Sequence, residues 1–489
     1  LLGSVRGMGD NILAVDPFER KAAKTDNRSG MLGIARWLKR GGCVGTFPAG
    51  EVSSLGPGRR SVTDREWNPH VAALARKTGA TVLPVYFEGR NSFFFQLAGL
   101  LHPVLRTILL PREFVRRENR EMHPRIGSPI PAGDLRQFES DDGATQYLRL
   151  QTYSLAERGM ASDSRKTLRF PFRAVSAKRP LETVADPERR ERLESEVADL
   201  PENARLVEHG DFAVYCATAR QIPALLREIG RLREATFRDV SEGSGRARDL
   251  DGFDNYYRHL FLWDRVHREV VGAYRLGMAD TILRTHGKRG LYSASLFKFR
   301  QGFPECLGAA IELGRSFIQT PYQKKHASLT LIWRGIGQFL ARHPQYRYLF
   351  GPVSITDAYQ AISKDLMVQF FRDHRFDRRW ARMVRARNPP RDAEIRNGIS
   401  LKSISRSVHS VDAISAIVAG FEQDGKGIPV LLRHYLKLNG VLLSFNVDPD
   451  FSDVIDGLIL VDLYKTDAKM MRRYIGESGY REFLGYREA

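Results

Sequence analysis

An acid and a base interrupt a short apolar run near the middle of the chain. Glu312 and Arg315 lie within residues 311–318, whose other side chains are mostly hydrophobic, a pattern typical of a buried strand. Charges in such a place are costly unless they are paired or used in chemistry. Side chains alternate along a regular strand, but a bulge at Gly314 would bring both charges onto one face. The run therefore predicts either a structural ion pair or a carboxylate that acts on a substrate.

Charged and aromatic residues precede this run in a recognisable order. The blocks are Leu232-Arg233-x-x-x-Phe237, Asp251-x-x-Asp254, Gly272-x-x-Arg275-Leu276 and Glu312-x-x-Arg315-Ser316-Phe317. Their order resembles the pattern of acyl-homoserine-lactone synthases. Residues 205–465 are still more similar to the ornithine-lipid N-acyltransferase (hemolysin-like) family, because a helix at 329–336 and a Leu-Phe-Gly-x-x-Ser strand at 349–354 follow. The resemblance implies a GNAT-type core that joins an acyl chain to an amine.

The resemblance also suggests roles for single residues. Such a reaction must position an amine and a thioester, remove a proton and stabilise an oxyanion. We expect Glu312 to be the base or the carboxylate that orients the amine. The other catalytic and substrate-binding candidates are Asp251 and Asp254 as ligands of a cationic amino-acid head, Arg233, Arg275 and Arg315 as carboxylate-binding or structural partners, and Phe237 and Trp263 as the lining of an acyl tunnel. Each charged residue could instead form a stabilising ion pair, and each aromatic could be core.

The segment after Ile318 bears on the acyl donor. Ordinary acetyltransferases hold the coenzyme A pyrophosphate at a basic, glycine-rich turn, but residues 319–325 contain no glycine. A donor on acyl carrier protein has a single phosphate to hold, and that carrier is acidic. Lys324, Lys325 and Arg334 would then form a docking face, although solvated lysines at a helix end are equally compatible. We expect acyl carrier protein, or coenzyme A, to deliver the acyl group, with no bound cofactor and no metal.

The first half carries a second set of motifs. Phe47-Pro48-Ala49-Gly50-Glu51-Val52-Ser53 and Val82-Leu83-Pro84-Val85 resemble the phosphate-binding and Val-x-Pro-Val blocks of lysophospholipid acyltransferases. The resemblance makes Phe47, Pro48, Gly50 and Ser53 substrate-binding candidates. Nearby charge could come from Arg59, Arg60, Arg65 and Arg90. The family's usual Glu-Gly-Thr-Arg is altered, and its His-x4-Asp block is missing before Asp16, so this half is either a fragment of an enzyme or a non-catalytic remnant.

Two α/β domains are expected to position these residues. In the first half, strands at 9–16, 43–47 and 81–87 alternate with helices at 31–39 and 71–77, which is typical of a mainly parallel sheet. The second half reads as a GNAT-like mixed sheet, with a helix at 222–237, a hairpin at 257–276, a strand at 307–318, a helix at 327–343 and a strand at 349–355. The predicted division is an acyltransferase-like domain at 1–160, a charged linker at 161–204, the GNAT-like domain at 205–470 and a tail at 471–489.

Composition limits the classes of function. The chain has 489 residues and a formal net charge of +19, which predicts an acidic partner such as a carrier protein, an anionic membrane or nucleic acid. Three dispersed cysteines indicate a reducing compartment. Residues 93–117 mix aromatic and aliphatic side chains with arginines, which favours a surface lying among lipid headgroups over a core helix pair. There is no run of eighteen apolar residues to span a membrane.

Together these features predict a bacterial lipid-synthesis acyltransferase that is cytoplasmic and peripheral on the inner face of the cell membrane. It would N-acylate an ornithine-like amino acid, and its first half would act on a lyso-lipid to add the second acyl chain. One alternative is a lactone signal synthase, which would not need the first half. The other is a basic nucleic-acid-binding protein, against which stands the lack of any helix-turn-helix, zinc or RNA-recognition motif.

Overall fold

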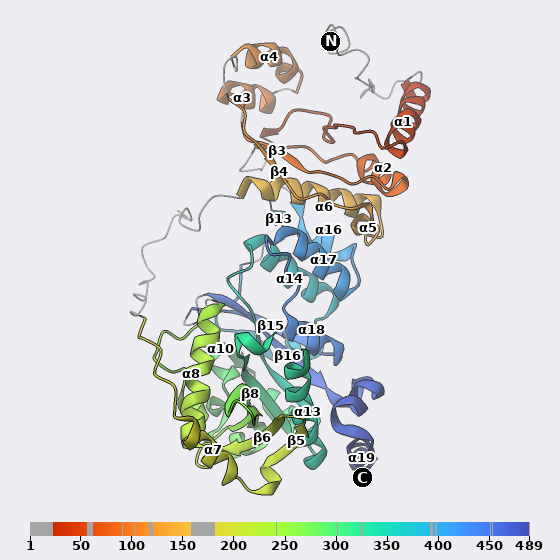
Figure 1. Cartoon of the computed structure of the whole chain (residues 1–489). Coiled ribbons are helices and arrows are strands. Elements are labelled where there is room, and N and C mark those ends of the chain that lie inside the picture. The colour runs from red at the N-terminus through yellow and green to blue at the C-terminus, as the bar shows by residue number, and fades with distance from the viewer. Residues whose placement is uncertain are drawn as a thin grey trace. The chain divides into compact units, whose positions relative to one another are not determined.

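The chain forms two compact units, drawn in Figure 1. This computed structural model describes residues 23–488 except 56–61, 90, 102, 117–120, 158–180, 241, 301, 324–325, 392–394, 397–398, 450 and 452. The first unit comprises Leu1–Arg169 with Asp365–Phe370 and Ala393–Gly427, and the second comprises the rest. The units therefore differ from the predicted division, because two segments of the expected 205–470 domain group with the first half.

Two further parts of that division differ in the structure. Part of the expected charged linker is helix α7 (Arg190–Ala198), which packs on α8 (Pro223–Asp239) through the buried Leu193. The expected tail is α19 (Ala468–Glu488), which packs against α13 (His326–Arg342). The contact is close enough that a Cβ at Gly337 of α13 would meet the Tyr474 backbone at 2.4 Å. Residues 190–198 and 471–488 are thus structured parts of the second unit.

The first unit is mainly helical in its described residues. Helix α2 covers the predicted 71–77 and runs from His70 to Thr78; it is capped by Gly79, whose φ of +78° is the left-handed conformation that glycine favours. Helix α6 packs Tyr147 against Phe138 and Phe421, with ring centroids 5.2 and 6.1 Å away. The helices are α1 (Ala23–Lys39), α2 (His70–Thr78), α3 (Phe93–Leu101), α4 (Pro103–Arg116), α5 (Ala132–Leu135), α6 (Asp141–Ser154), α16 (Leu401–Arg406) and α17 (Val411–Phe421), while α14 (Ala361–His374) belongs in part to each unit.

The mainly parallel sheet predicted for the first half is wrong for the described residues. Their strands form antiparallel pairs only: β1 (Ser54–Leu55) with β2 (Val62–Thr63), β3 (Val85–Phe87) with β4 (Pro124–Ile126), and β13 (Ile395–Arg396) with β14 (Ile399–Ser400). Residues 43–47 have no regular structure, and the predicted strand at 9–16 lies outside the described residues. Short apolar runs beside glycine and proline do not reveal their pairing partner, so the direction of pairing was not readable from them.

The second unit contains an eight-stranded mixed sheet, which confirms the GNAT-like expectation. Its strand order is β15-β16-β11-β10-β8-β7-β6-β5, and only the β10–β11 pair is parallel. The predicted hairpin, strands and flanking helix all lie within one to three residues of the observed elements. The strands are β5 (Arg205–His209), β6 (Phe212–Thr218), β7 (Arg258–Asp264), β8 (Glu269–Met278), β10 (Ala310–Ile318), β11 (Tyr348–Ile355), β15 (Val441–Asp448) and β16 (Val454–Asp462).

The middle of this sheet is irregular where the chemistry-bearing run lies. Parallel pairing between β10 and β11 covers only Ala310 to Glu312, although β10 continues to Ile318. On its other edge β10 pairs with β8, and the register shifts between Gly314 and Phe317, which confirms the predicted bulge. Gly272 of β8 faces this bulge, where a Cβ would stand 2.5 Å from the Phe317 carbonyl oxygen. Both the bulge and the end of β10–β11 pairing at Glu312 change the directions of the side chains that follow Glu312.

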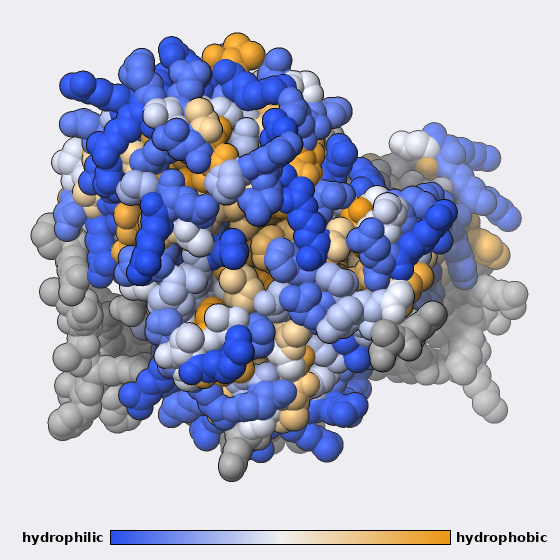
Figure 2. Space-filling view, turned by 90° about the horizontal axis from the view of Figure 1, so that it is seen from below, coloured by the Kyte–Doolittle hydropathy of each residue, from blue (hydrophilic) through white to orange (hydrophobic). Residues whose placement is uncertain are grey.

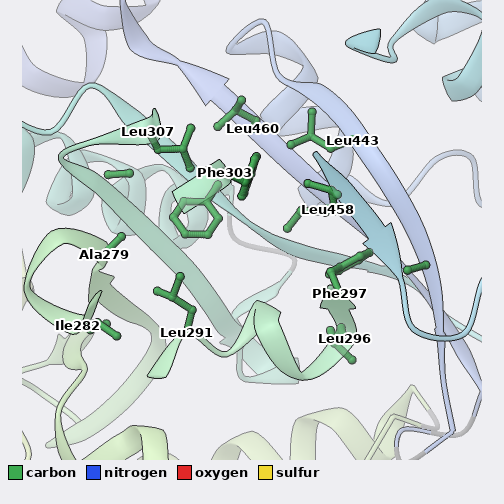
Figure 3. Close-up of a cluster of buried hydrophobic side chains, with 14 of the residues drawn as sticks. Ala279, Ile282, Leu291, Leu296, Phe297, Phe303, Leu307, Leu443, Leu458 and Leu460 are labelled. Carbon is green, nitrogen blue, oxygen red and sulfur yellow. The ribbon is translucent and has the colours of Figure 1, made fainter. Parts of the chain in front are cut away.

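The second unit contains two buried hydrophobic clusters, to which shorter elements contribute. Figure 3 shows one, in which Phe303 lies among aliphatic side chains from the sheet and from short helices, including Leu291, Leu307 and Leu458. The other packs α8 onto β7 and β8 through Ile229, Phe261 and neighbours. Figure 2 views the molecule from the end where α7 and α13 lie, and that face is mostly hydrophilic. The remaining elements are α9 (Ala279–His286), α10 (Ser293–Leu296), β9 (Phe297–Phe299), α11 (Phe303–Leu307), α12 (Thr320–Gln323), α15 (Arg378–Ala381), β12 (Val384–Ala386) and α18 (Val430–Lys437).

Candidate active site

Glu312 lies at the last paired position of β10 with β11 and is 1% exposed. Its Oε1 accepts a hydrogen bond from the Ser293 backbone N–H at 2.6 Å, and its Oε2 accepts from the Tyr292 N–H at 3.0 Å. The Tyr257 hydroxyl also donates to Oε2. Burial raises the pKa of Tyr257 far above its usual value, and the negative charge of Glu312 raises it further. The carboxylate is therefore not locked to a guanidinium; it holds the backbone that leads into α10.

Two fully buried arginines lie beside it, at the junction of α8 and β8. Arg233 contacts Asp249 at 2.8 Å and Asp254 at 3.0 Å, and Arg275 contacts Asp251 at 2.6 Å and Asp254 at 3.3 Å. Burial would raise the pKa of Asp254, but the two guanidinium groups outweigh it and hold that pKa well below its usual range. Asp254 is 2% exposed and both its oxygens are occupied. This arrangement favours the ion-pair interpretation for Arg233, Arg275 and Asp254.

Asp251 occupies a different position in the same loop. Its side chain caps a short 3-10 turn by accepting a hydrogen bond from the Phe253 N–H at 2.9 Å. In return, the Asp251 N–H donates to the Asp254 carboxylate at 2.8 Å. Oδ1 of Asp251 thus binds both the Phe253 N–H and Arg275, and Oδ2 lies 3.7 Å from the Arg315 Nη2. Its side chain is 22% exposed. Of the two predicted carboxylate ligands, only Asp251 keeps an oxygen directed to the open side of the cluster.

Arg315 lies on the bulge, where its φ of +51° is a left-handed conformation that residues other than glycine adopt at a cost. The guanidinium carbon lies 4.9 Å from the centre of the Tyr292 ring and 4.4 Å from that of Phe451. Its Nε is 3.6 Å from Asp249, too long for a hydrogen bond, and among the described residues this nitrogen has no hydrogen-bond partner. Glu312 binds the Tyr292 backbone N–H and Arg315 lies near the Tyr292 ring, so both charged side chains contact this residue.

Two further carboxyl groups, Glu242 and Asp456, lie within electrostatic reach of Arg315, and sequence reasoning missed both. Burial raises the pKa of Glu242 to about 7, with the Arg315 charge opposing the shift. Burial also raises the pKa of Asp456 to about 7, and the neighbouring Asp448 adds to that shift. Asp456 interrupts the apolar run of β16 just as Glu312 interrupts that of β10, so the same signal could have found it. Glu242, in a polar loop, carries no such signal.

The two predicted tunnel aromatics lie in different surroundings. Phe237 is partly buried and packs edge-on against Phe451 at 6.3 Å, which places it one ring away from Arg315. Trp263 is 3% exposed and lies in the hydrophobic cluster between α8 and the sheet. Phe237 is therefore close enough to border a substrate, whereas the surroundings of Trp263 are those of a core residue.

The phosphate-block residues of the first unit form an exposed turn. The Gly50 N–H donates to the Phe47 carbonyl at 3.0 Å, Gly50 has a φ of +64°, and Phe47 is 82% exposed. The Ser53 hydroxyl donates to Asp64, so it is already engaged. Arg65 pairs with Glu51 at 2.8 Å, which places one of the predicted arginines beside the turn. The other three, Arg59, Arg60 and Arg90, lie outside the described residues, as do Lys324 and Lys325 of the proposed docking face; Arg334 is partly buried on α13.

Comparisons with known proteins place an acyltransferase domain in this part of the chain. The family described as "Acetyltransferase (GNAT) domain" matches residues 232–334, the stretch that contributes Arg233, Asp251, Arg275, Glu312 and Arg315. The second unit contains a GNAT domain. The chain is also 28% identical over 298 residues to proteins named "Glycine N(alpha)-acyltransferase" from Phocaeicola vulgatus and Bacteroides thetaiotaomicron, covering 58% of this chain and 89% and 86% of theirs. This protein is an acyltransferase.

A third relative is named for a different reaction. The chain is 28% identical over 115 residues to a "Lyso-glycine lipid O-acyltransferase" from Phocaeicola vulgatus, a match that covers 22% of this chain and 40% of that protein. No solved structure matches the chain at a significant level. Within the residues that the structure describes, no group of three or more histidine, cysteine or acidic side chains could hold a metal ion, and no helix is long and apolar enough to cross a membrane.

Proposed function

We propose that the second unit transfers a fatty acyl chain from a thioester to the α-amino group of an amino acid, giving an N-acyl amino acid for lipid synthesis. The observation that carries this proposal is that the Arg315 guanidinium has an Nε without a hydrogen-bond partner in the described residues. Its guanidinium lies between two aromatic rings, its carboxylate neighbours are 3.6 and 3.7 Å away, and its Nε has no hydrogen-bond partner in the described residues. A planar donor held in this way suits a substrate carboxylate or a developing oxyanion.

The surrounding residues divide the work of such a reaction. Asp251 and the carboxyl groups near Arg315 supply negative charge for the acceptor's ammonium group. Glu312 positions Tyr292, whose ring flanks Arg315, because its carboxylate accepts the Tyr292 and Ser293 N–H groups. The geometry favours this positioning role over the predicted role of Glu312 as the base, since three donors already occupy its oxygens.

The names of the relatives support glycine as the acceptor, and the ornithine-like acceptor implied by the family resemblance remains the second choice. Both present an α-carboxylate for Arg315 and an α-amine for the acidic groups, so the site chemistry is shared. The donor is an acyl thioester on acyl carrier protein or coenzyme A. The net charge of +19 supports an acidic carrier through long-range attraction.

For the first unit we propose lyso-lipid O-acylation at a membrane surface, with the turn at residues 47–53 facing the substrate headgroup. Ser92, just before α3, links it to α4, because its N–H and its hydroxyl both donate to Glu113. Their exposed side chains are strongly apolar: Phe93 and Phe94 are 76% and 71% exposed. Aromatic and aliphatic groups in such positions favour contact with lipid headgroups and acyl chains.

Lipid mass spectrometry of cells that express the chain tests both halves. Wild type should produce an N-acyl amino acid, together with its O-acylated derivative if the first unit is active. Arg315→Met should abolish both products, whereas Arg347→Met, which removes an arginine stacked on Tyr348 and Tyr464 at the sheet's other end, should leave them. A new lipid whose amount is unchanged in Arg315→Met would contradict the proposed site.

A further inference from the structure

Glu242 is a buried carboxyl group, one of whose oxygens has no hydrogen-bond partner among the described residues. It follows α8 in the chain, and its N–H donates to the Phe237 carbonyl at 2.7 Å, which turns the chain back toward the helix. The residue is 8% exposed, and within the described residues its Oε1 accepts no hydrogen bond. A buried acceptor with no donor costs free energy in the resting protein. Such an atom is expected where a ligand supplies the missing donor.

The charges around Glu242 come from three elements. Arg315 of β10 attracts it, and Asp456 of β16 carries a second carboxyl group within electrostatic reach. On α8, the Arg238–Glu234 ion pair at 2.7 Å lies beside Gly243. Burial raises the pKa of Glu242 to about 7, against a usual value of 4.5. At neutral pH the group is therefore divided between its two protonation states, which suits a proton acceptor.

The other carboxylates near Arg315 are less free to accept a proton. Those of Glu312 and Asp254 are occupied by hydrogen bonds and ion pairs. Asp456 accepts the Ser354 hydroxyl at 2.9 Å. Asp251 binds the Phe253 N–H and Arg275 through one oxygen, and its other oxygen lies 3.7 Å from Arg315 Nη2. Asp249 also has a buried oxygen without a hydrogen bond, but that oxygen is paired with Arg233 Nε at 2.8 Å. Among these six carboxyl groups, Glu242 alone has a buried oxygen that makes neither a hydrogen bond nor an ion pair in the described residues.

We propose that Glu242 binds the ammonium group of the acyl acceptor beside Arg315 and takes its proton. This inference rests on the proposed N-acyltransfer. The ammonium N–H bond breaks and its proton moves to the Glu242 carboxylate, which leaves a neutral amine. The amine lone pair forms the new C–N bond at the thioester carbonyl carbon. The C–S bond then breaks, the thiolate takes the second nitrogen proton, and Glu242 returns its proton to solvent. One amine and one thioester give one amide and one thiol.

The pH dependence of glycine acylation by the purified full chain, with a palmitoyl thioester as donor and product measured by mass spectrometry, tests the proposal. The wild-type kcat/KM for glycine should rise with pH through about 7, because Glu242 must be ionised. Glu242→Gln should lower kcat/KM about 100-fold or more and remove this limb of the profile. Glu242→Asp, which keeps a carboxylate, should restore the limb with a lower rate.

Matched controls separate this role from a structural one. Glu228→Gln changes a buried glutamate on α8 that pairs with Arg231 at 2.5 Å, away from Arg315. The kcat/KM of Glu228→Gln should still rise with pH through about 7. If Glu242→Gln keeps the limb, or if only Asp456→Asn removes it, the assignment to Glu242 is overturned. If wild type acylates no amine at all, the proposed function fails instead, and that result is distinguishable because it appears before any variant is compared.

Discussion

Replacing Glu312 with glutamine separates a positioning role from a catalytic one. The carboxylate accepts three hydrogen bonds in a site that is 1% exposed. Glutamine keeps one acceptor oxygen, which can continue to bind the Ser293 N–H, but it turns an NH2 group toward the other two donors. The Tyr257 hydroxyl can turn to the Gly290 carbonyl, 3.3 Å away, and the Tyr292 N–H can keep its 3.0 Å bond to the Tyr257 oxygen.

The expected loss is therefore smaller than the sum of two orphaned donors. Hydrogen bonds to a charged group contribute about 1.5–3 kcal/mol each, and partial rearrangement leaves a net destabilisation of about 2 kcal/mol. For a domain of this size that corresponds to a melting temperature lowered by about 4–8 °C. Glu312→Ala, which removes the acceptor of all three hydrogen bonds, should lower the free energy of unfolding about twice as much as Glu312→Gln.

Differential scanning fluorimetry and acylation rates on the same preparations provide the measurement. We expect Glu312→Gln to lower the melting temperature and the rate together, while the rate still rises with pH through about 7. A variant that melts with the wild type yet loses more than 1,000-fold in kcat would refute this reasoning. Glu312 would then be the base, as its position in the apolar run first indicated.

Three other perturbations have defined outcomes. Arg275→Met should destabilise the second unit by about 3–5 kcal/mol, measured by urea unfolding, because it leaves Asp254 with one cation instead of two in a dry site. Glu242→Gln should have no effect on unfolding free energy near pH 4.5 and should stabilise the protein progressively as pH rises through about 7. Because the pKa is 4.5 in the unfolded chain and about 7 in the folded protein, the wild type loses stability between these two pH values, where the unfolded chain is ionised and the folded protein is not. The loss reaches about 3 kcal/mol, at about 1.4 kcal/mol per tenfold change in proton affinity. Equal unfolding curves at pH 8 would contradict the burial argument. Phe93→Ser with Phe94→Ser should weaken sedimentation with anionic vesicles without changing the melting temperature, because both rings are exposed. Unchanged sedimentation would remove α3 from the membrane-contact proposal.

Local pattern was sufficient for much of the second unit. Short apolar runs predicted β7, β8, β10 and β11 within a few residues, because strands buried on both faces are apolar along most of their length. The bulge was readable from Gly314, since a charged residue on either side of a glycine in an apolar run makes a regular strand costly. The GNAT-like sheet follows from the order of these elements.

The first unit shows the limit of that approach. Short runs such as residues 43–47 and 81–87 have strand-like composition, but strand direction depends on a partner elsewhere in the chain. The structure pairs β3 with β4 in antiparallel register and leaves 43–47 irregular. Grouping of residues 393–427 with the first unit was equally unreadable, because no local signal marks a segment that joins another core.

The sequence by itself determined which residues carry charge inside apolar runs, because the order of apolar and charged residues is a local property of the chain. What only the tertiary structure decided is which of those charges are occupied. Asp254 and Glu312 have their oxygens occupied by Arg233, Arg275 and backbone N–H groups, while Glu242, within electrostatic reach of Arg315, keeps an oxygen that accepts no hydrogen bond in the described residues. Hydrogen-bond partners are set by the register of distant strands and loops, and no spacing along the chain encodes them.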